Sequence, residues 1–201
     1  MLTLLRPTLV LLGLFTILLG GLYPLAMTAF ARLAFPWQAG GSVIHVDGRV
    51  VGSALIGQET TSPDYFLGRP SATTGVPTNA AASGASNLGP SNPALTQAVA
   101  GRIRHLQRLD PGLPAAISLD LVTASASGLD PHISPQAALC QIPRIARLRD
   151  LPETRLRDLV AEHTLSRWPW LFGEDRVVVL ELNLALDRLQ ARSEADTEPS
   201  R

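Results

Sequence analysis

The segment from Thr123 to Pro135 contains the side chains most capable of chemistry: Ser125, Ser127, Asp130 and His132. These residue types form hydrolytic triads, but triad members meet in space from distant positions in the chain. The sequence also has no Gly-x-Ser-x-Gly motif for an exposed nucleophile. We therefore interpret the segment as a turn in which Asp130 accepts bonds from nearby backbone amides. It leads into a helix that Ser134 caps and Pro135 begins.

Phosphate and metal chemistry have weaker support. A Ser-Gly pair before a helix start can hold phosphate, but the chain has no Gly-x-x-x-x-Gly-Lys motif and no lysine. Its four histidines are scattered, and none pairs with another at helical i, i+4 spacing. The residues by themselves therefore predict no catalytic centre, no metal site and no tightly bound cofactor.

The strongest signal for organisation is the uncharged run of 24 residues from Thr8 to Ala31, between Arg6 and Arg32. About 20 apolar residues suffice for a helix to cross a bilayer. The alternative is a cleaved secretory signal, for which Ala29-Phe30-Ala31 resembles a cleavage site. We favour a retained anchor because the apolar run continues past Pro24, which should kink the helix. The two arginines do not fix orientation, but both interpretations place the remaining chain outside the cytoplasm.

Composition limits the rest of the chain to one modest domain. The formal net charge is zero and the pI is about 6.9, so no basic field indicates nucleic acid. Cys140 is alone and cannot form an internal disulfide. We expect an α+β protein with one N-terminal transmembrane helix and a single mixed soluble domain. Its predicted parts are a short tail over 1–7, the transmembrane helix over 8–31, the extracytoplasmic domain over 32–191 and a disordered tail over 192–201.

In the first half of that domain, local signals predict a hairpin over 42–58 with a type I′ turn at Asp47-Gly48. Tyr65 and Phe66 are expected to fill the core; the alternative is that this turn serves a partner, with Arg69 pairing with the partner's acid. The polar, nearly uncharged stretch from Thr73 to Ser91 is predicted to be a long loop that is either mobile or held against something else.

In the second half, Asn92 should cap a helix from Pro93. Its apolar face should comprise Leu95, Val99, Ile103 and Leu106, and its outer face Arg102, Arg104 and Arg108. A strand is predicted over 117–122. A helix from Pro135 should bury Leu139, Ile142 and Ile145 and be kinked at Pro143. A further helix should follow an Asp150–Glu153 capping box and contain Leu156, Leu159, Val160 and His163. A turn over 168–170, a strand over 176–180 and a short helix over 182–189 complete the chain.

Four motifs occur in order along the chain: Tyr-Phe-x-Gly-Arg-Pro-Ser-Ala over 65–72, Ser-Asn-Leu-Gly-Pro-Ser-Asn-Pro over 86–93, the segment 123–135, and Leu-Asn-Leu-Ala-Leu-Asp over 182–187. Together they resemble the C subunit of the bacterial potassium-transporting Kdp ATPase, the KdpC family. The resemblance extends from the apolar segment to Asp187. The chain departs from the family pattern at Glu59, Ala85 and Ala126, which affects the expected loop conformations more than the identification.

The resemblance implies a single-pass protein of the bacterial inner membrane with a cytoplasmic N-terminus and an extracytoplasmic domain. Its expected partners are the lipid bilayer, a channel-like potassium-binding subunit and a P-type ATPase subunit. The C subunit is not the phosphorylated chain, and this sequence has no Asp-Lys-Thr-Gly-Thr motif. Nothing in the resemblance implies a nucleic-acid partner.

The resemblance leaves two roles open: covering the outer entrance of the potassium path, or assisting ATP binding as a nucleotide-associated chaperone. We favour the entrance role because an outward domain cannot meet cytosolic ATP, so ATP is expected only through the complex. A solitary secreted periplasmic protein is the competing class. The candidate partner, ion-entrance or ligand residues are Arg69, Ser86, Asn87, Asn92, Ser125, Ser127, Asp130 and His132.

Overall fold

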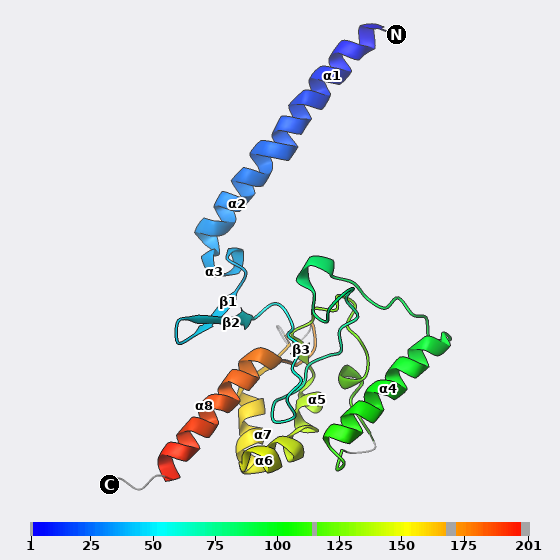
Figure 1. The fold of residues 1–201 in the computed structure, drawn as a ribbon. Coiled ribbons are helices and arrows are strands. Elements are labelled where there is room, and N and C mark those ends of the chain that lie inside the picture. Colours follow the sequence, from blue (N-terminus) through cyan, green and yellow to red (C-terminus); the bar gives the residue numbers. More distant parts are fainter. Residues whose placement is uncertain (1, 114–115, 168–171, 198–201) are drawn as a thin grey trace. The chain divides into compact units, whose positions relative to one another are not determined.

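The computed structural model describes residues 2–113, 116–167 and 172–197, and the chain divides into two compact units at Ser53 and Ala54 (Figure 1). The first unit begins with one long helix made of α1 (Leu2–Ile17), a π-helical segment (Leu18–Leu22) and α2 (Tyr23–Ala34). The stretch Leu4–Ala34 is long and apolar enough to cross a membrane, and none of it is buried by the protein. A signal sequence would meet the same criteria.

A kink was predicted at Pro24, but Figure 1 shows α1 and α2 continuing as one helix without a pronounced kink, and the irregularity is limited to the π-helical segment just before the proline. Proline has no N–H to donate to the carbonyl four residues earlier, so the regular ladder of the helix is interrupted there. At about 1.5 Å per residue, the 31 residues of Leu4–Ala34 extend about 46 Å. This exceeds the roughly 30 Å of a bilayer core. The helical residues run from Leu2 to Ala34, beyond both ends of the predicted span 8–31.

The hairpin follows a short helix, α3 (Pro36–Ala39), and pairs β1 (Val43–Val46) with β2 (Arg49–Ser53). Asp47 and Gly48 both have positive φ, 50° and 76°, which confirms the predicted turn because type I′ requires this conformation at both central residues. The second strand ends at Ser53, earlier than the predicted 58.

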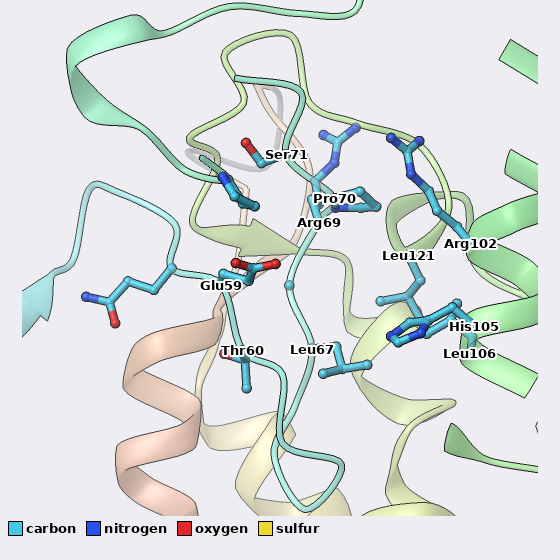
Figure 2. A pocket seen from close by; sticks show the side chains of 13 residues that line it. Glu59, Thr60, Leu67, Arg69, Pro70, Ser71, Arg102, His105, Leu106 and Leu121 are labelled. Atoms are coloured by element: carbon cyan, nitrogen blue, oxygen red, sulfur yellow. The ribbon is translucent and has the colours of Figure 1, made fainter. Parts of the chain in front are cut away.

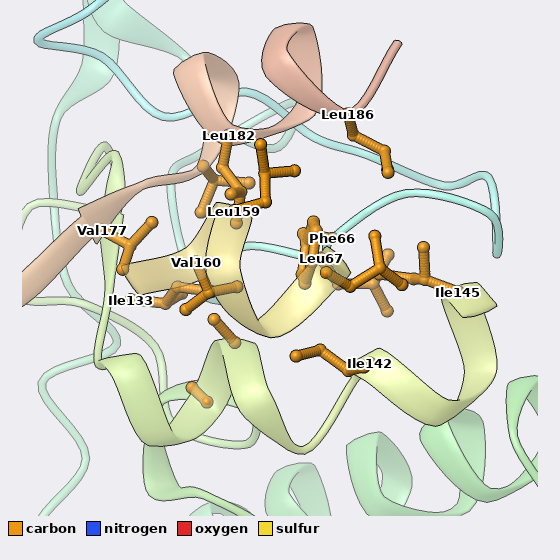
Figure 3. Packing of buried hydrophobic residues seen from close by; sticks show 14 of the residues in the cluster. Phe66, Leu67, Ile133, Ile142, Ile145, Leu159, Val160, Val177, Leu182 and Leu186 are labelled. Carbon is orange, nitrogen blue, oxygen red and sulfur yellow. The ribbon is translucent and has the colours of Figure 1, made fainter. Parts of the chain in front are cut away.

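The second unit packs helices against a small antiparallel sheet with strand order β3 (His132–Ile133), β5 (Arg176–Val178) and β4 (Thr164–Leu165). Its helices are α4 (Pro93–Leu109), α5 (Pro135–Leu139), α6 (Ile142–Arg149), α7 (Glu153–Glu162) and α8 (Val179–Thr197). Figure 3 shows the core between α5, α6, α7 and α8. The mixed α+β class is therefore confirmed.

Phe66 is fully buried in this core, as predicted, although it belongs to an extended segment without a strand partner (Figure 3). The Asn183 amide replaces that partner: its Oδ1 accepts from Phe66 N at 2.9 Å and its Nδ2 donates to Phe66 O at 3.0 Å. Gln141 does the same for Leu67, at 2.8 and 3.1 Å. Buried backbone groups need such partners, so the residue that precedes α6 and a residue of α8 together fix the extended segment.

Several local predictions hold. Asn92 caps α4 by accepting from Ala94 N, and Ser134 caps α5 by accepting from Ala137 N. Leu106 is buried on α4, and Val99 and Ile103 pack against the core. Of the four residues predicted for this helix, Leu156, Leu159 and Val160 are buried, whereas His163 follows the end of α7 and is half-buried.

Others are wrong. The apolar run over 117–122 contains a 3-10 turn (Leu119–Leu121) instead of a strand. Leu139 is exposed, while Ile142 and Ile145 are fully buried. Pro143 stands in the first turn of the separate helix α6, where a missing N–H is harmless, so it does not kink a continuous helix.

The predicted capping box before α7 is also wrong, because Asp150 ends α6 in the left-handed conformation and no side chain caps α7. Helix α8 continues to Thr197, so the residues from Arg192 to that point are helical where disorder was expected. The predicted turn over 168–170 lies outside the described residues.

Candidate functional site

Five of the predicted site residues line one open hollow of about 560 Å³ in the second unit. They are Arg69, Ser125, Ser127, Asp130 and His132. Arg69 comes from the extended segment just beyond Phe66, and the others from the loop that precedes β3 and from β3 itself. Two segments that are distant in sequence therefore form a single polar surface.

Asp130 is the centre of this surface. Its Oδ2 accepts from Arg69 Nη1 at 3.1 Å, and its Oδ1 accepts from the backbone N of His132 at 3.0 Å. The Nδ1 of the His132 ring lies 3.0 Å from the same Oδ1. The pKa of Asp130 is lowered to about 2, mainly by the hydrogen bond with the His132 side chain, with further contributions from the His132 amide and Arg69. The carboxylate is therefore ionised at physiological pH.

This arrangement corrects the expectation for Arg69. The acid that Arg69 binds belongs to the same chain, and its Nη2 also reaches the Ala124 carbonyl at 3.5 Å. Ser125 lines the hollow but is only 3 % exposed, so it contributes little accessible surface there. Ser127 Oγ accepts a hydrogen bond from Leu129 N within its own turn.

The polar loop over 73–91 is held against this turn. Ser127 O accepts from Gly84 N at 2.9 Å and from Ser83 Oγ at 3.0 Å. Ser71 Oγ donates to Gly128 O at 2.8 Å. Of the two possibilities left open by the sequence, the structure therefore has the loop docked against the protein itself.

Gly128 makes that docking possible. It has a φ of +67°, and a Cβ there would lie 2.6 Å from Thr73 Cγ2 and 2.8 Å from Gly84 O. Contacts this short do not occur for real side chains, and the left-handed conformation itself disfavours other residues. The close approach of the two loops therefore requires glycine at this position.

The other three predicted site residues do not reach the hollow. Asn92 is the cap of α4. Ser86 and Asn87 are exposed on the loop, and Asn87 adopts a left-handed conformation with φ of 52°. They belong to the same polar loop but not to the cluster around Asp130.

Sequence reasoning missed the second polar cluster, around Arg149 at the end of α6. Arg149 Nη1 donates to Asp187 Oδ1 and to Gln190 Oε1, both at 2.8 Å, and Nε donates to Asp64 O at 2.9 Å. Its guanidinium lies 4.3 Å from the centre of the Tyr65 ring, a cation–π contact. The Asp187 carboxylate within an otherwise apolar helical pattern was the available signal.

The architecture defines a class of protein: a long apolar N-terminal helix that precedes a small α+β unit with an ordered polar surface. Comparison with known proteins makes this specific. The family described as "K+-transporting ATPase, c chain" matches residues 5–188. The chain belongs to this family, the KdpC family.

Curated relatives agree over nearly the whole length. The chain is 60 % identical to the potassium-transporting ATPase KdpC subunit of Polaromonas naphthalenivorans, with 92 % of this chain and 95 % of the relative covered. It is 56 % identical to the proteins of the same name from Ralstonia nicotianae, covering 93 % of this chain and 92 % of the relative, and from Sorangium cellulosum, covering 93 % and 98 %.

Proposed function

We propose that this chain is a non-catalytic accessory subunit of an ATP-driven potassium uptake complex. The family match over residues 5–188 is the observation that carries the proposal, and the shared name of the relatives supports it. Its partners in the complex would be a channel-like potassium-binding subunit and a P-type ATPase subunit. The family does not favour a solitary secreted protein or a nucleotide-binding chaperone.

Within that complex, the subunit covers the outer entrance of the potassium path. In this arrangement the long helix crosses the bacterial inner membrane once, with the N-terminus in the cytoplasm and the second unit outside. The support is the docked polar surface formed by the loop over 73–91 and the turn over 125–132. It has few charges and many fixed carbonyls and hydroxyls, groups that favour a partly hydrated cation over an anion.

Asp130 provides the electrostatic test of this role. Its charge balances that of Arg69, so Asp130→Asn leaves the arginine uncompensated beside the proposed ion entrance. For one unit charge at roughly 7 Å in water, the repulsion of a potassium ion is about 0.6 kcal/mol, or about threefold in affinity. Arg69→Gln removes the opposite charge and should strengthen potassium affinity by a similar factor.

The experiment measures ATP hydrolysis by the purified complex as a function of potassium concentration. Asp187→Asn is the matched control, because Asp187 also pairs with an arginine in the second unit but lies in the Arg149 cluster. Asp130→Asn should raise the half-saturating potassium concentration, while Asp187→Asn leaves it unchanged. Unaltered potassium affinity of an assembled Asp130→Asn complex would refute the entrance role.

A further inference from the structure

A second hollow, of about 230 Å³, lies between the extended segment that carries Arg69 and helix α4. The polar side chains that argue for its chemistry are Glu59, Thr60, Arg69, Arg102 and His105. Figure 2 shows the guanidinium groups of Arg69 and Arg102 directed to the same side of this hollow. Two guanidinium groups from distant parts of the chain therefore face one solvent-accessible space.

Arg102 differs from Arg69 because it forms no ion pair with a carboxylate of the described residues. Its side chain was predicted to point outward from α4, but it folds back and its Nη1 donates to Val122 O at 2.9 Å. Among the described residues, no carboxylate forms an ion pair with it within 4.0 Å. Burial lowers the pKa of Arg102, since a partly desolvated cation without a counter-charge is disfavoured. A carbonyl oxygen offsets this only in part.

The neighbouring groups leave that charge uncompensated. The charge of Arg69 is already paired with Asp130. Glu59 is exposed and lines the same hollow, but it forms no ion pair with Arg102 or with any other cation in the described part of the chain. His105 lies one turn beyond Arg102 on α4 and also lines the hollow. An anion seated here would therefore complete the coordination of Arg102.

We propose that this hollow binds a phosphate-class oxyanion, with the free N–H groups of Arg102 as its principal donors. Arg69, the Thr60 hydroxyl and the His105 ring line the same space and supply secondary contacts. Guanidinium N–H groups match the spacing of phosphate oxygens. The volume accommodates such an ion with several waters, each of which occupies about 30 Å³. This inference is independent of the proposed entrance role of Asp130.

Isothermal titration of the full-length chain in detergent with inorganic phosphate tests the site. We expect saturable binding of one phosphate per chain. Arg102→Gln should weaken binding at least tenfold, the usual effect of losing charge-assisted hydrogen bonds. Arg104→Gln is the matched control: it removes the same charge from the same helix, but Arg104 is exposed and does not line the hollow, so phosphate affinity should change less than twofold.

Two further variants separate a specific site from general electrostatics or misfolding. Glu59→Gln removes an acid that lines the hollow and should strengthen phosphate binding roughly threefold. Arg102→Lys keeps the charge but loses the planar donor pair, so it should retain the fold and weaken binding to an intermediate degree. The proposal is overturned by non-saturable binding, by equal losses in Arg102→Gln and Arg104→Gln, or by weaker binding in Glu59→Gln. None of these results bears on potassium affinity in the Asp130 variants.

Discussion

The ionised state of Asp130 should make the stability of the second unit depend on pH in the acid range. The folded pKa of about 2 compares with 3.8 for an unperturbed aspartate. At about 1.36 kcal/mol per pH unit, this difference corresponds to about 2 kcal/mol of stabilisation from the charged form. Because the folded pKa is lowered, the stabilisation is complete above the unfolded pKa and is lost as the pH falls through about 2.

Urea unfolding of the full-length chain in detergent, followed by circular dichroism between pH 6 and pH 2.5, measures this effect. Asp130→Asn should reduce the free energy of unfolding by about 2 kcal/mol at pH 6. The difference between the two proteins should narrow toward pH 2.5, because this pH lies below the unfolded pKa of 3.8, so the unfolded natural chain binds a proton that the folded chain, with its pKa of about 2, still largely excludes. His132→Ala should remove more of the pH-dependent part than Arg69→Gln, since the His132 side chain is the main cause of the lowered pKa.

A difference between the natural chain and Asp130→Asn that stays constant over this pH range would refute the reasoning. It would mean that the variant acts through shape or hydrogen-bond number and not through charge. Glu59→Gln is a suitable control because Glu59 is exposed and outside the Asp130 cluster. Its free energy of unfolding should follow the natural chain at each pH.

Two further substitutions probe the supports of the site by thermal unfolding. Asn183→Ala should lower the free energy of unfolding by about 2–4 kcal/mol, because the backbone N–H and C=O of Phe66 would lose their partners inside the core. Asn92→Ala removes an exposed helix cap and should cost roughly 1 kcal/mol. A loss in Asn183→Ala no larger than that would contradict the prediction. Gly128→Ala should destabilise the docked loops by at least about 1 kcal/mol and increase proteolysis within 73–91, whereas Gly89→Ala, where a Cβ would have open space, should do neither.

Short-range signals in the sequence were sufficient wherever the stabilising contact is itself local. The turn at Asp47-Gly48 and the caps at Asn92 and Ser134 depend on backbone conformation and on bonds to residues two or three positions away. The buried face of α7 follows from helical periodicity alone. For such features the stabilising contact lies within a few residues of the position it stabilises.

Most of the failures depend on partners outside that short range. The apolar run over 117–122 has strand composition, but Thr123 Oγ1 donates to Leu119 O at 2.7 Å and Asp120 accepts from Ser134 N at 2.8 Å, and these bonds stabilise a 3-10 turn. The partner of Arg69 is 61 positions away. Arg102 turns inward because a carbonyl on a neighbouring loop is available. The partners of Asp120, Arg69 and Arg102 lie 14, 61 and 20 positions away, so local pattern and composition do not reveal them.

The extended segment around Phe66 connects the core to both polar hollows. Its backbone is fixed by two side-chain amides, from Asn183 and Gln141, which lie 117 and 74 positions away in the chain. These two amides allow only one position of the segment along the chain direction, because the Phe66 ring must lie in the core while the Phe66 N–H and C=O are hydrogen-bonded to Asn183. Arg69 follows only a few residues later, so the geometry of its pair with Asp130 is set by packing in the core. The apolar core therefore controls the charge distribution of the surface that we assign to the ion entrance.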